Sequence, residues 1–77
     1  MTNTKELKRK ISESGLKLGF IAEKLDISYH WLNKKINNET PFKAYEIQIL
    51  CEVLSISNLE EKEAIFFAHD VEDTSTN

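Results

Sequence analysis

The chain has 77 residues, of which 40% are hydrophobic, and 10 Lys and Arg against 13 Asp and Glu give a formal net charge of −3. This length allows one small domain and excludes a TIM barrel or a full dinucleotide-binding fold, and a single cysteine excludes an internal disulfide framework. No apolar stretch approaches the ~20 residues of a membrane span, and the first six residues lack the apolar segment of a secretory signal, so we expect a cytoplasmic protein.

Hydrophobic residues recur with helical spacing, and no segment shows the clear alternation of a strand. We therefore predict an all-α fold, a compact bundle of five short helices over about residues 5–14, 18–25, 29–37, 43–54 and 58–68. The apolar faces of these helices carry the expected core: Leu7, Ile11, Ile21, Ala22, Leu25, Leu32, Ile36, Ile47, Leu50, Cys51 and Leu54. Cys51 on this stripe is expected to be a small buried hydrophobe.

Residues that favour helix ends set the boundaries of these segments. The expected N-caps are Thr4, Ser28 and either Ser57 or Asn58. Gly15 is expected to end the first helix in the left-handed conformation, and Pro41 belongs to the loop before the fourth helix. We expect one domain over residues 1–69 and an acidic, polar, disordered tail over residues 70–77.

The segments 18–25 and 29–37, joined by a short turn, carry the most specific pattern in the chain. Ala22 is a small residue at the expected crossing of the two helices, where a larger side chain would push them apart. The positions that such a pair buries are apolar: Ile21, Leu25, Ile27, Leu32 and Ile36. This packing projects the N-terminal half of the second helix of the pair outward, where it can enter a major groove.

The stretch from Leu18 to Asn37 resembles the helix-turn-helix of Cro and phage-repressor DNA-binding proteins. Over about residues 5–68 the chain is similar to small Cro-like regulators of Gram-positive temperate phages, through the runs Ile36-Asn37-Asn38, Pro41-Phe42, Glu46-Ile47 and Ile65-Phe66-Phe67. The resemblance implies a transcriptional regulator that binds a double-stranded DNA operator in a sequence-specific manner. Two features depart from the family pattern. Asp26 replaces the glycine of the turn, and Lys17 and Leu18 replace a Ser or Thr cap and a phosphate-binding Gln.

If Leu32 and Ile36 face the core, the outer side of the segment 29–37 is polar. The residues expected to contact bases are Tyr29, His30, Asn33 and Lys34, which match base-contacting positions of the family. Asn33 can pair with adenine through two hydrogen bonds, and Lys34 can donate to guanine or to a phosphate. The residues expected to contact the DNA backbone are Lys17, Ser28, Lys35, Asn37, Lys5, Lys8 and Arg9.

Simpler interpretations stand beside these assignments. The basic stripe on the first helix can equally be a solvated face, and Trp31 can contact DNA or pack against the following loop. The last helix carries more apolar residues than one core contact can bury. Either a wide face closes the core, or Phe66 and Phe67 meet a second copy of the chain or another partner.

The charges divide unevenly along the chain. Residues 1–43 hold nine bases and five acids, a net charge of +4, and residues 44–77 hold one base and eight acids, a net charge of −7. We interpret this division as an orientation signal, in which the acidic part repels phosphate and leaves the third helix facing DNA. The alternative is a protein-interaction modulator that binds a repressor through its acidic second half.

Enzymatic chemistry is not expected. The chain lacks a nucleophile motif and a glycine-rich phosphate loop. His30, Cys51 and His69 lack the spacing of metal ligands, so we expect no metal, no cofactor and no small-molecule substrate.

Overall fold

The computed structural model describes residues 1–68, in which five helices and no strand are found. The helices are α1 (Thr4–Ser14), α2 (Leu18–Leu25), α3 (Tyr29–Ile36), α4 (Ala44–Val53) and α5 (Leu59–Phe66). The predicted all-α bundle of five short helices is confirmed, and every helix end lies within two residues of its predicted place. The predicted tail over 70–77, together with His69, lies outside the described residues.

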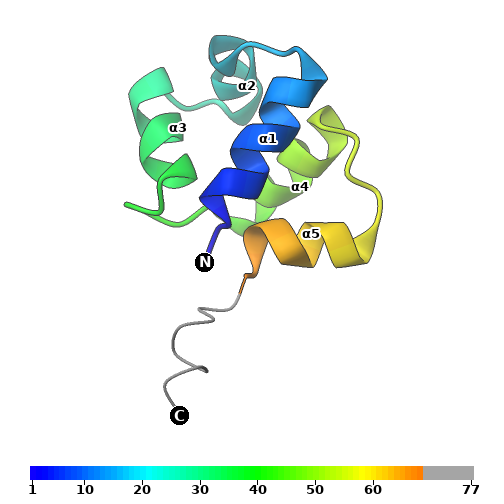
Figure 1. Ribbon diagram of the computed structural model, residues 1–77. Coiled ribbons are helices and arrows are strands. Elements are labelled where there is room, and N and C mark those ends of the chain that lie inside the picture. Colours follow the sequence, from blue (N-terminus) through cyan, green and yellow to red (C-terminus); the bar gives the residue numbers. More distant parts are fainter. Residues whose placement is uncertain (69–77) are drawn as a thin grey trace.

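The helices pack around one core. In Figure 1, α1 lies in the middle of the view, with α2 above it, α3 to its left, α5 below it and α4 partly behind it. α2 packs against α3 and α4, and α1 contacts α3 and α5. The α2–α3 pair and α5 therefore occupy different sides of the molecule.

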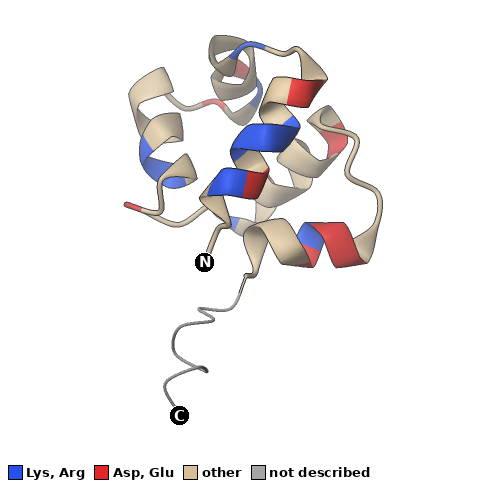
Figure 2. Ribbon diagram, in the orientation of Figure 1, with Lys and Arg blue, Asp and Glu red and all other residues tan. Residues whose placement is uncertain are grey.

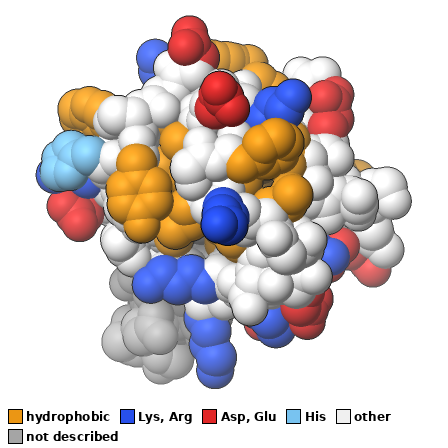
Figure 3. Space-filling view, turned by 90° about the horizontal axis from the view of Figure 1, so that it is seen from above, with side chains coloured by type: hydrophobic (Ala, Val, Ile, Leu, Met, Phe, Trp, Pro, Cys, Tyr) orange, Lys and Arg blue, Asp and Glu red, His pale blue; other side chains and the backbone are white. Residues whose placement is uncertain are grey.

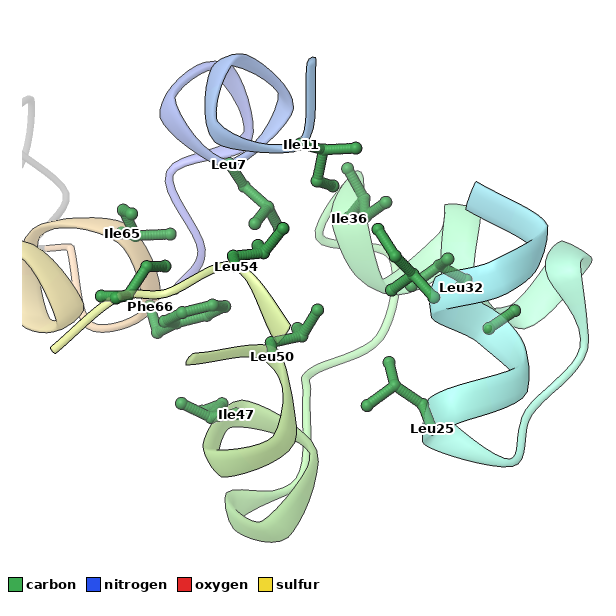
Figure 4. Close-up of a cluster of buried hydrophobic side chains, with 13 residues drawn as sticks. Leu7, Ile11, Leu25, Leu32, Ile36, Ile47, Leu50, Leu54, Ile65 and Phe66 are labelled. Carbon is green, nitrogen blue, oxygen red and sulfur yellow. The ribbon is translucent and has the colours of Figure 1, made fainter. Parts of the chain in front are cut away.

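Thirteen apolar side chains form the core, and they come from all five helices and from the connection between α4 and α5. Figure 4 shows Leu7 and Ile11 of α1, Leu32 and Ile36 of α3, and Leu50 of α4 converging on the same interior. Cys51 does not belong to this set: it is partly exposed and only packs against the core's edge, contrary to the prediction. The core is instead completed by three residues from the second half of the chain, Ile56, Ile65 and Phe66.

Side-chain caps start three of the helices. Ser28 accepts from the Trp31 N–H at 3.0 Å, as predicted. Asn58, one of the two caps predicted for the last helix, accepts from the first turn of α5. The predicted cap of α1 is wrong: Asn3 Oδ1 accepts the Glu6 N–H at 3.2 Å. Thr4 instead donates its hydroxyl to the Ile36 carbonyl of α3 at 2.6 Å. A tertiary contact thus takes the hydroxyl that the sequence pattern assigns to a local cap.

The turn between α2 and α3 is held by backbone geometry. Asp26 ends α2 in the left-handed conformation, with φ of 58°, a conformation that glycine most often supplies. The Ile27 N–H returns to the Ala22 carbonyl at 3.1 Å, which closes the end of α2. Aspartate tolerates this region better than most side chains, so the turn forms without glycine.

Candidate nucleic-acid interface

The inner side of α3 is fixed in the core. Leu32 is fully buried and Ile36 is 2% exposed. On α2, Ala22 is 3% exposed, as expected for a small residue where helices pack closely. The α2–α3 pair is therefore packed through one buried face, and the opposite side of α3 is turned away from the core.

The four residues predicted to contact bases lie on this outer side. Tyr29 is 56% exposed, His30 is exposed, and Asn33 and Lys34 are partly exposed. The amide nitrogen of Asn33 donates to the Tyr29 carbonyl at 3.1 Å. Because an amide has two N–H groups and an acceptor oxygen, Asn33 retains the groups needed to pair with adenine.

The ends of α3 add further polar groups. Ser28 and Asn37 are exposed, and the Asn37 amide nitrogen lies 3.0 Å from the Asn33 carbonyl. Lys34 Nζ is 3.3 Å from Glu39 Oε1. An exposed ion pair of this kind contributes little to stability, so a phosphate or a base can replace Glu39 as the partner of Lys34.

Lys35 does not lie on this surface, and its predicted contact with DNA is wrong. Its side chain is 8% exposed, and Nζ lies 2.7 Å from Glu46 Oε1 and 3.3 Å from the Pro41 carbonyl. Glu46, itself 1% exposed, also accepts the Lys43 N–H at 2.8 Å. Lys35 lies three residues after Leu32 and next to Ile36, so helical spacing turns it inward, where it joins α3 to α4.

The basic stripe on α1 is exposed, but its members differ. The Arg9 guanidinium binds Glu6 at 2.8 Å and Glu13 at 2.7 Å. The hydrogen bond from Arg9 lowers the pKa of the Glu6 carboxyl, so this carboxylate stays charged beside it. Lys5 and Lys8 make no ion pair within residues 1–68. These two lysines are the stronger candidates for phosphate contacts, because Arg9 is already neutralised.

In two helices the N-cap residue is a lysine, whose side chain cannot accept a hydrogen bond from the first turn. Lys17 precedes α2 and Lys43 precedes α4, and both side chains are exposed. The helix dipole disfavours a cation at a helix N-terminus. A phosphate bound there is stabilised by the lysine charge and by hydrogen bonds from the unpaired N–H groups of the first turn. Lys17 is one of the predicted backbone contacts, whereas Lys43 is not. The sequence signal for Lys43 is the absence of Ser, Thr, Asn or Asp directly before the segment 44–53.

Aromatic side chains extend the surface beside α3. Trp31 and Tyr45 are each about half exposed, and with Lys43 they line a cleft of about 400 Å³ between α3 and α4. Thr40 of the loop before α4 lines the same cleft, so Trp31 lies beside that loop and remains accessible. Seen from above, Figure 3 shows basic and apolar side chains interleaved on one face.

Ion pairs in the folded domain neutralise some of the charges that distinguish the basic residues 1–43 from the acidic residues 44–77. Figure 2 shows basic positions on α1 and α3 and acidic positions at the start of α5. Two ion pairs join the basic and acidic parts of the chain: Lys35 with Glu46, and Lys10 with Glu61 at 3.0 Å. Six lysines make no ion pair among the described residues: Lys5, Lys8, Lys17, Lys24, Lys43 and Lys62. All of them except Lys62 lie in the basic first part of the chain.

The predicted partner surface of Phe66 and Phe67 is wrong for Phe66 and stays a prediction for Phe67. Phe66 is 3% exposed and packs edge-to-face on Phe42, with ring centroids 5.9 Å apart, so it belongs to the core. The helix enters the core by its C-terminal turn, which inserts the adjacent residues Ile65 and Phe66 together. Phe67 and Leu59 remain 51% and 67% exposed.

The connection between α4 and α5 borders an open groove. Its volume is about 620 Å³, and Cys51, Ile56 and Leu59 are among its lining residues. Burial raises the pKa of the Cys51 thiol, so the sulfur is held in its neutral form. The groove is lined by α4, by the connection that follows it and by the first half of α5, and it includes no residue of α3.

Comparisons of the chain with protein-family models, with curated proteins and with solved structures gave no match. Within residues 1–68, no helix has the length and apolar character needed to cross a bilayer. The same part of the chain contains no cluster of three side chains of metal-ligating type. Arguments about function therefore depend on the surface around α3.

Proposed function

We propose that this protein is a transcriptional regulator that binds double-stranded DNA sequence-specifically in the cytoplasm, with α3 in the major groove. One observation carries the proposal: α3 is anchored on one side by buried residues and presents hydrogen-bonding side chains along the other. An α-helix of this kind fits a major groove, where each base pair has a distinct donor and acceptor pattern. The similarity of residues 18–37 to Cro and phage-repressor motifs makes a phage-derived regulator the expected class.

The exposed residues are assigned to two kinds of contact, one with the base edges and one with the DNA backbone. Tyr29, His30, Asn33 and Lys34 are assigned to base contacts. Backbone contacts are assigned to Lys17, Ser28, Asn37, Lys5 and Lys8, with Lys43 added and Lys35 removed. Arg9 is a weaker candidate, because Glu6 and Glu13 compete with phosphate for its guanidinium.

A homodimer is the expected functional form. Phe67 and Leu59 expose apolar surface on α5, away from the outer side of α3. A symmetric contact through α5 leaves both copies of α3 accessible, as binding to paired half-sites about one DNA turn apart requires.

Selection of bound duplexes from a random DNA pool tests the proposal. We expect enrichment of a palindrome, because two symmetric copies of α3 read inverted half-sites. Lys34→Ala should weaken binding to the selected duplex, and Lys62→Ala, the same change on α5, should not. A pool that shows no enriched sequence after repeated rounds contradicts the proposal.

The second candidate function is binding of a repressor protein. The exposed Leu59 and Phe67, with the exposed acids Glu60 and Glu63 on the same helix, favour a protein partner over nucleic acid. Mixing the protein with operator DNA and with a candidate repressor separates the two functions. A complex with the repressor, and none with DNA, supports the second.

A further inference from the structure

The first residues of the chain form a strap along the end of α5. The Asn3 N–H donates to the Ile65 carbonyl at 2.6 Å, and the Ala68 N–H donates to the Met1 carbonyl at 3.0 Å. The two bonds therefore tie the start of the chain to the last turn of α5 and to the residues that follow it. We call Met1–Thr4 the N-terminal strap.

Asn38 holds the other side of this strap. Its Oδ1 accepts the Thr2 N–H at 2.9 Å, and its Nδ2 donates to the Thr2 carbonyl at 2.6 Å. The same Nδ2 lies 3.3 Å from the Thr4 hydroxyl oxygen, which donates to the Ile36 carbonyl at 2.6 Å. Thr2 is 6% exposed, so both of its backbone groups depend on this one amide.

The backbone of Asn38 fixes where its side chain points. Asn38 has φ of 64°, and its N–H returns to the Lys35 carbonyl at 3.2 Å. Asparagine is enriched in this left-handed region, so conformation alone could explain the residue. Glycine satisfies the same conformation without a side chain, so conformation does not account for the two-point hydrogen bonding to Thr2.

We propose that Asn38 is a positioning residue for DNA reading, which clamps the end of α3 to the N-terminal strap and, through it, to α5. This inference rests on the proposed function. Asn33, Lys34 and Asn37 lie in the last part of α3 or at its end, so their directions depend on how that end is held. Recognition of base edges requires side chains placed to within about half an ångström, whereas non-specific attraction to phosphate tolerates more freedom.

Two glycine variants separate conformation from clamping. Asn38→Gly keeps the left-handed turn and removes the side-chain hydrogen bonds. Ser55→Gly is the matched control, because Ser55 has φ of 58° in the connection between α4 and α5 and makes no side-chain hydrogen bond within residues 1–68. Both substitutions place glycine at a residue with a left-handed backbone conformation, and Ser55 lies far in sequence from α3.

Affinity and amide exchange are measured on the full chain below its melting temperature. For Asn38→Gly we expect about a tenfold loss for the selected duplex and less than about a twofold change for random-sequence DNA. The exchange rates of the Asn37, Glu39 and Ala68 amides should rise in the same variant, because the end of α3 and the N-terminal strap are no longer joined by the Asn38 side chain. Ser55→Gly should change none of these quantities.

An equal loss of affinity for both kinds of DNA would show a purely structural role and overturn the inference. Unchanged exchange at the three amides would also overturn it, because no clamp would then exist. If the unsubstituted protein selects no duplex, the proposed function fails instead. The exchange comparison then still decides whether Asn38 tethers the end of α3.

Discussion

α3 and α5 have the same length of eight residues and both start at a side-chain cap, yet they are held in different ways. α3 buries Leu32, Lys35 and Ile36, and its outer side is polar. α5 buries only Ile65 and Phe66 at its end, and it starts with the exposed Leu59. α3 thus presents polar groups on the side opposite its buried residues, whereas α5 exposes apolar surface.

The difference extends to the ion pairs that tie each helix to its neighbours. The pair of Lys35 with Glu46 joins α3 to α4 and is almost fully buried, at 8% and 1% side-chain exposure. The pair of Lys10 with Glu61 joins α1 to α5, and its side chains are 19% and 33% exposed. Burial makes the first pair costly to break, and water screens the second.

The largest expected effect is therefore the loss of the buried lysine. Lys35→Ala leaves the Glu46 carboxylate buried beside α3 without its cation, and should lower the free energy of unfolding by about 3–5 kcal/mol. Lys34→Ala, its neighbour in sequence, should lower it by less than about 0.5 kcal/mol. Urea denaturation followed by circular dichroism measures both. Equal losses for the two variants would mean that Lys35 is not buried in solution.

Leucine truncation compares the helices directly. Leu32→Ala removes a fully buried side chain under α3 and should cost about 2–5 kcal/mol of unfolding free energy. Leu59→Ala, at 67% exposure on α5, should cost less than about 0.5 kcal/mol in the monomer. The same denaturation series measures both at low protein concentration. A large loss for Leu59→Ala that grows with protein concentration would reveal an interface on α5.

Base reading and phosphate contact should respond differently to substitution. Asn33→Ala should weaken binding to the selected duplex by about 1–3 kcal/mol and leave random-sequence binding nearly unchanged. Lys8→Ala should weaken binding to all sequences alike and reduce the salt slope by about one. Gel-shift titrations over a range of salt concentrations distinguish the two patterns. If Asn33→Ala affects all sequences alike, Asn33 does not read bases.

Much of this fold follows from local sequence patterns. The bounds of α2, the Ser28 cap and the left-handed Gly15 are set by residues a few positions apart. The outer side of α3 follows from the same periodicity, because Leu32 and Ile36 define the inner side. Short-range chemistry of this kind is visible without knowledge of tertiary contacts.

Several of the errors involve contacts between residues that are distant in sequence. Helical spacing turns Lys35 inward, but the carboxylate that pairs with it in the core belongs to Glu46, eleven positions away. The Thr4 hydroxyl donates to the Ile36 carbonyl instead of capping α1. The sequence pattern gives no sign of the hydrogen bond from the Asn38 side chain to Thr2. Phe66 and Phe67 are adjacent and chemically identical, so only the way in which α5 enters the core separates them. Such pairings depend on the assembled bundle.

The smallest expected effect concerns the connections that lead into the two helices. α3 is entered through Asp26 and α5 through Ser55, and both residues have φ of 58°. Glycine removes the left-handed strain but gives the unfolded chain more freedom, and the two terms largely cancel. Because aspartate tolerates this conformation better than serine, Asp26→Gly should change the free energy of unfolding by less than about 0.5 kcal/mol, and Ser55→Gly should raise it by up to about 1 kcal/mol. Thermal denaturation of the two variants side by side measures the order, and a larger gain for Asp26→Gly would place the greater strain at the entrance to α3.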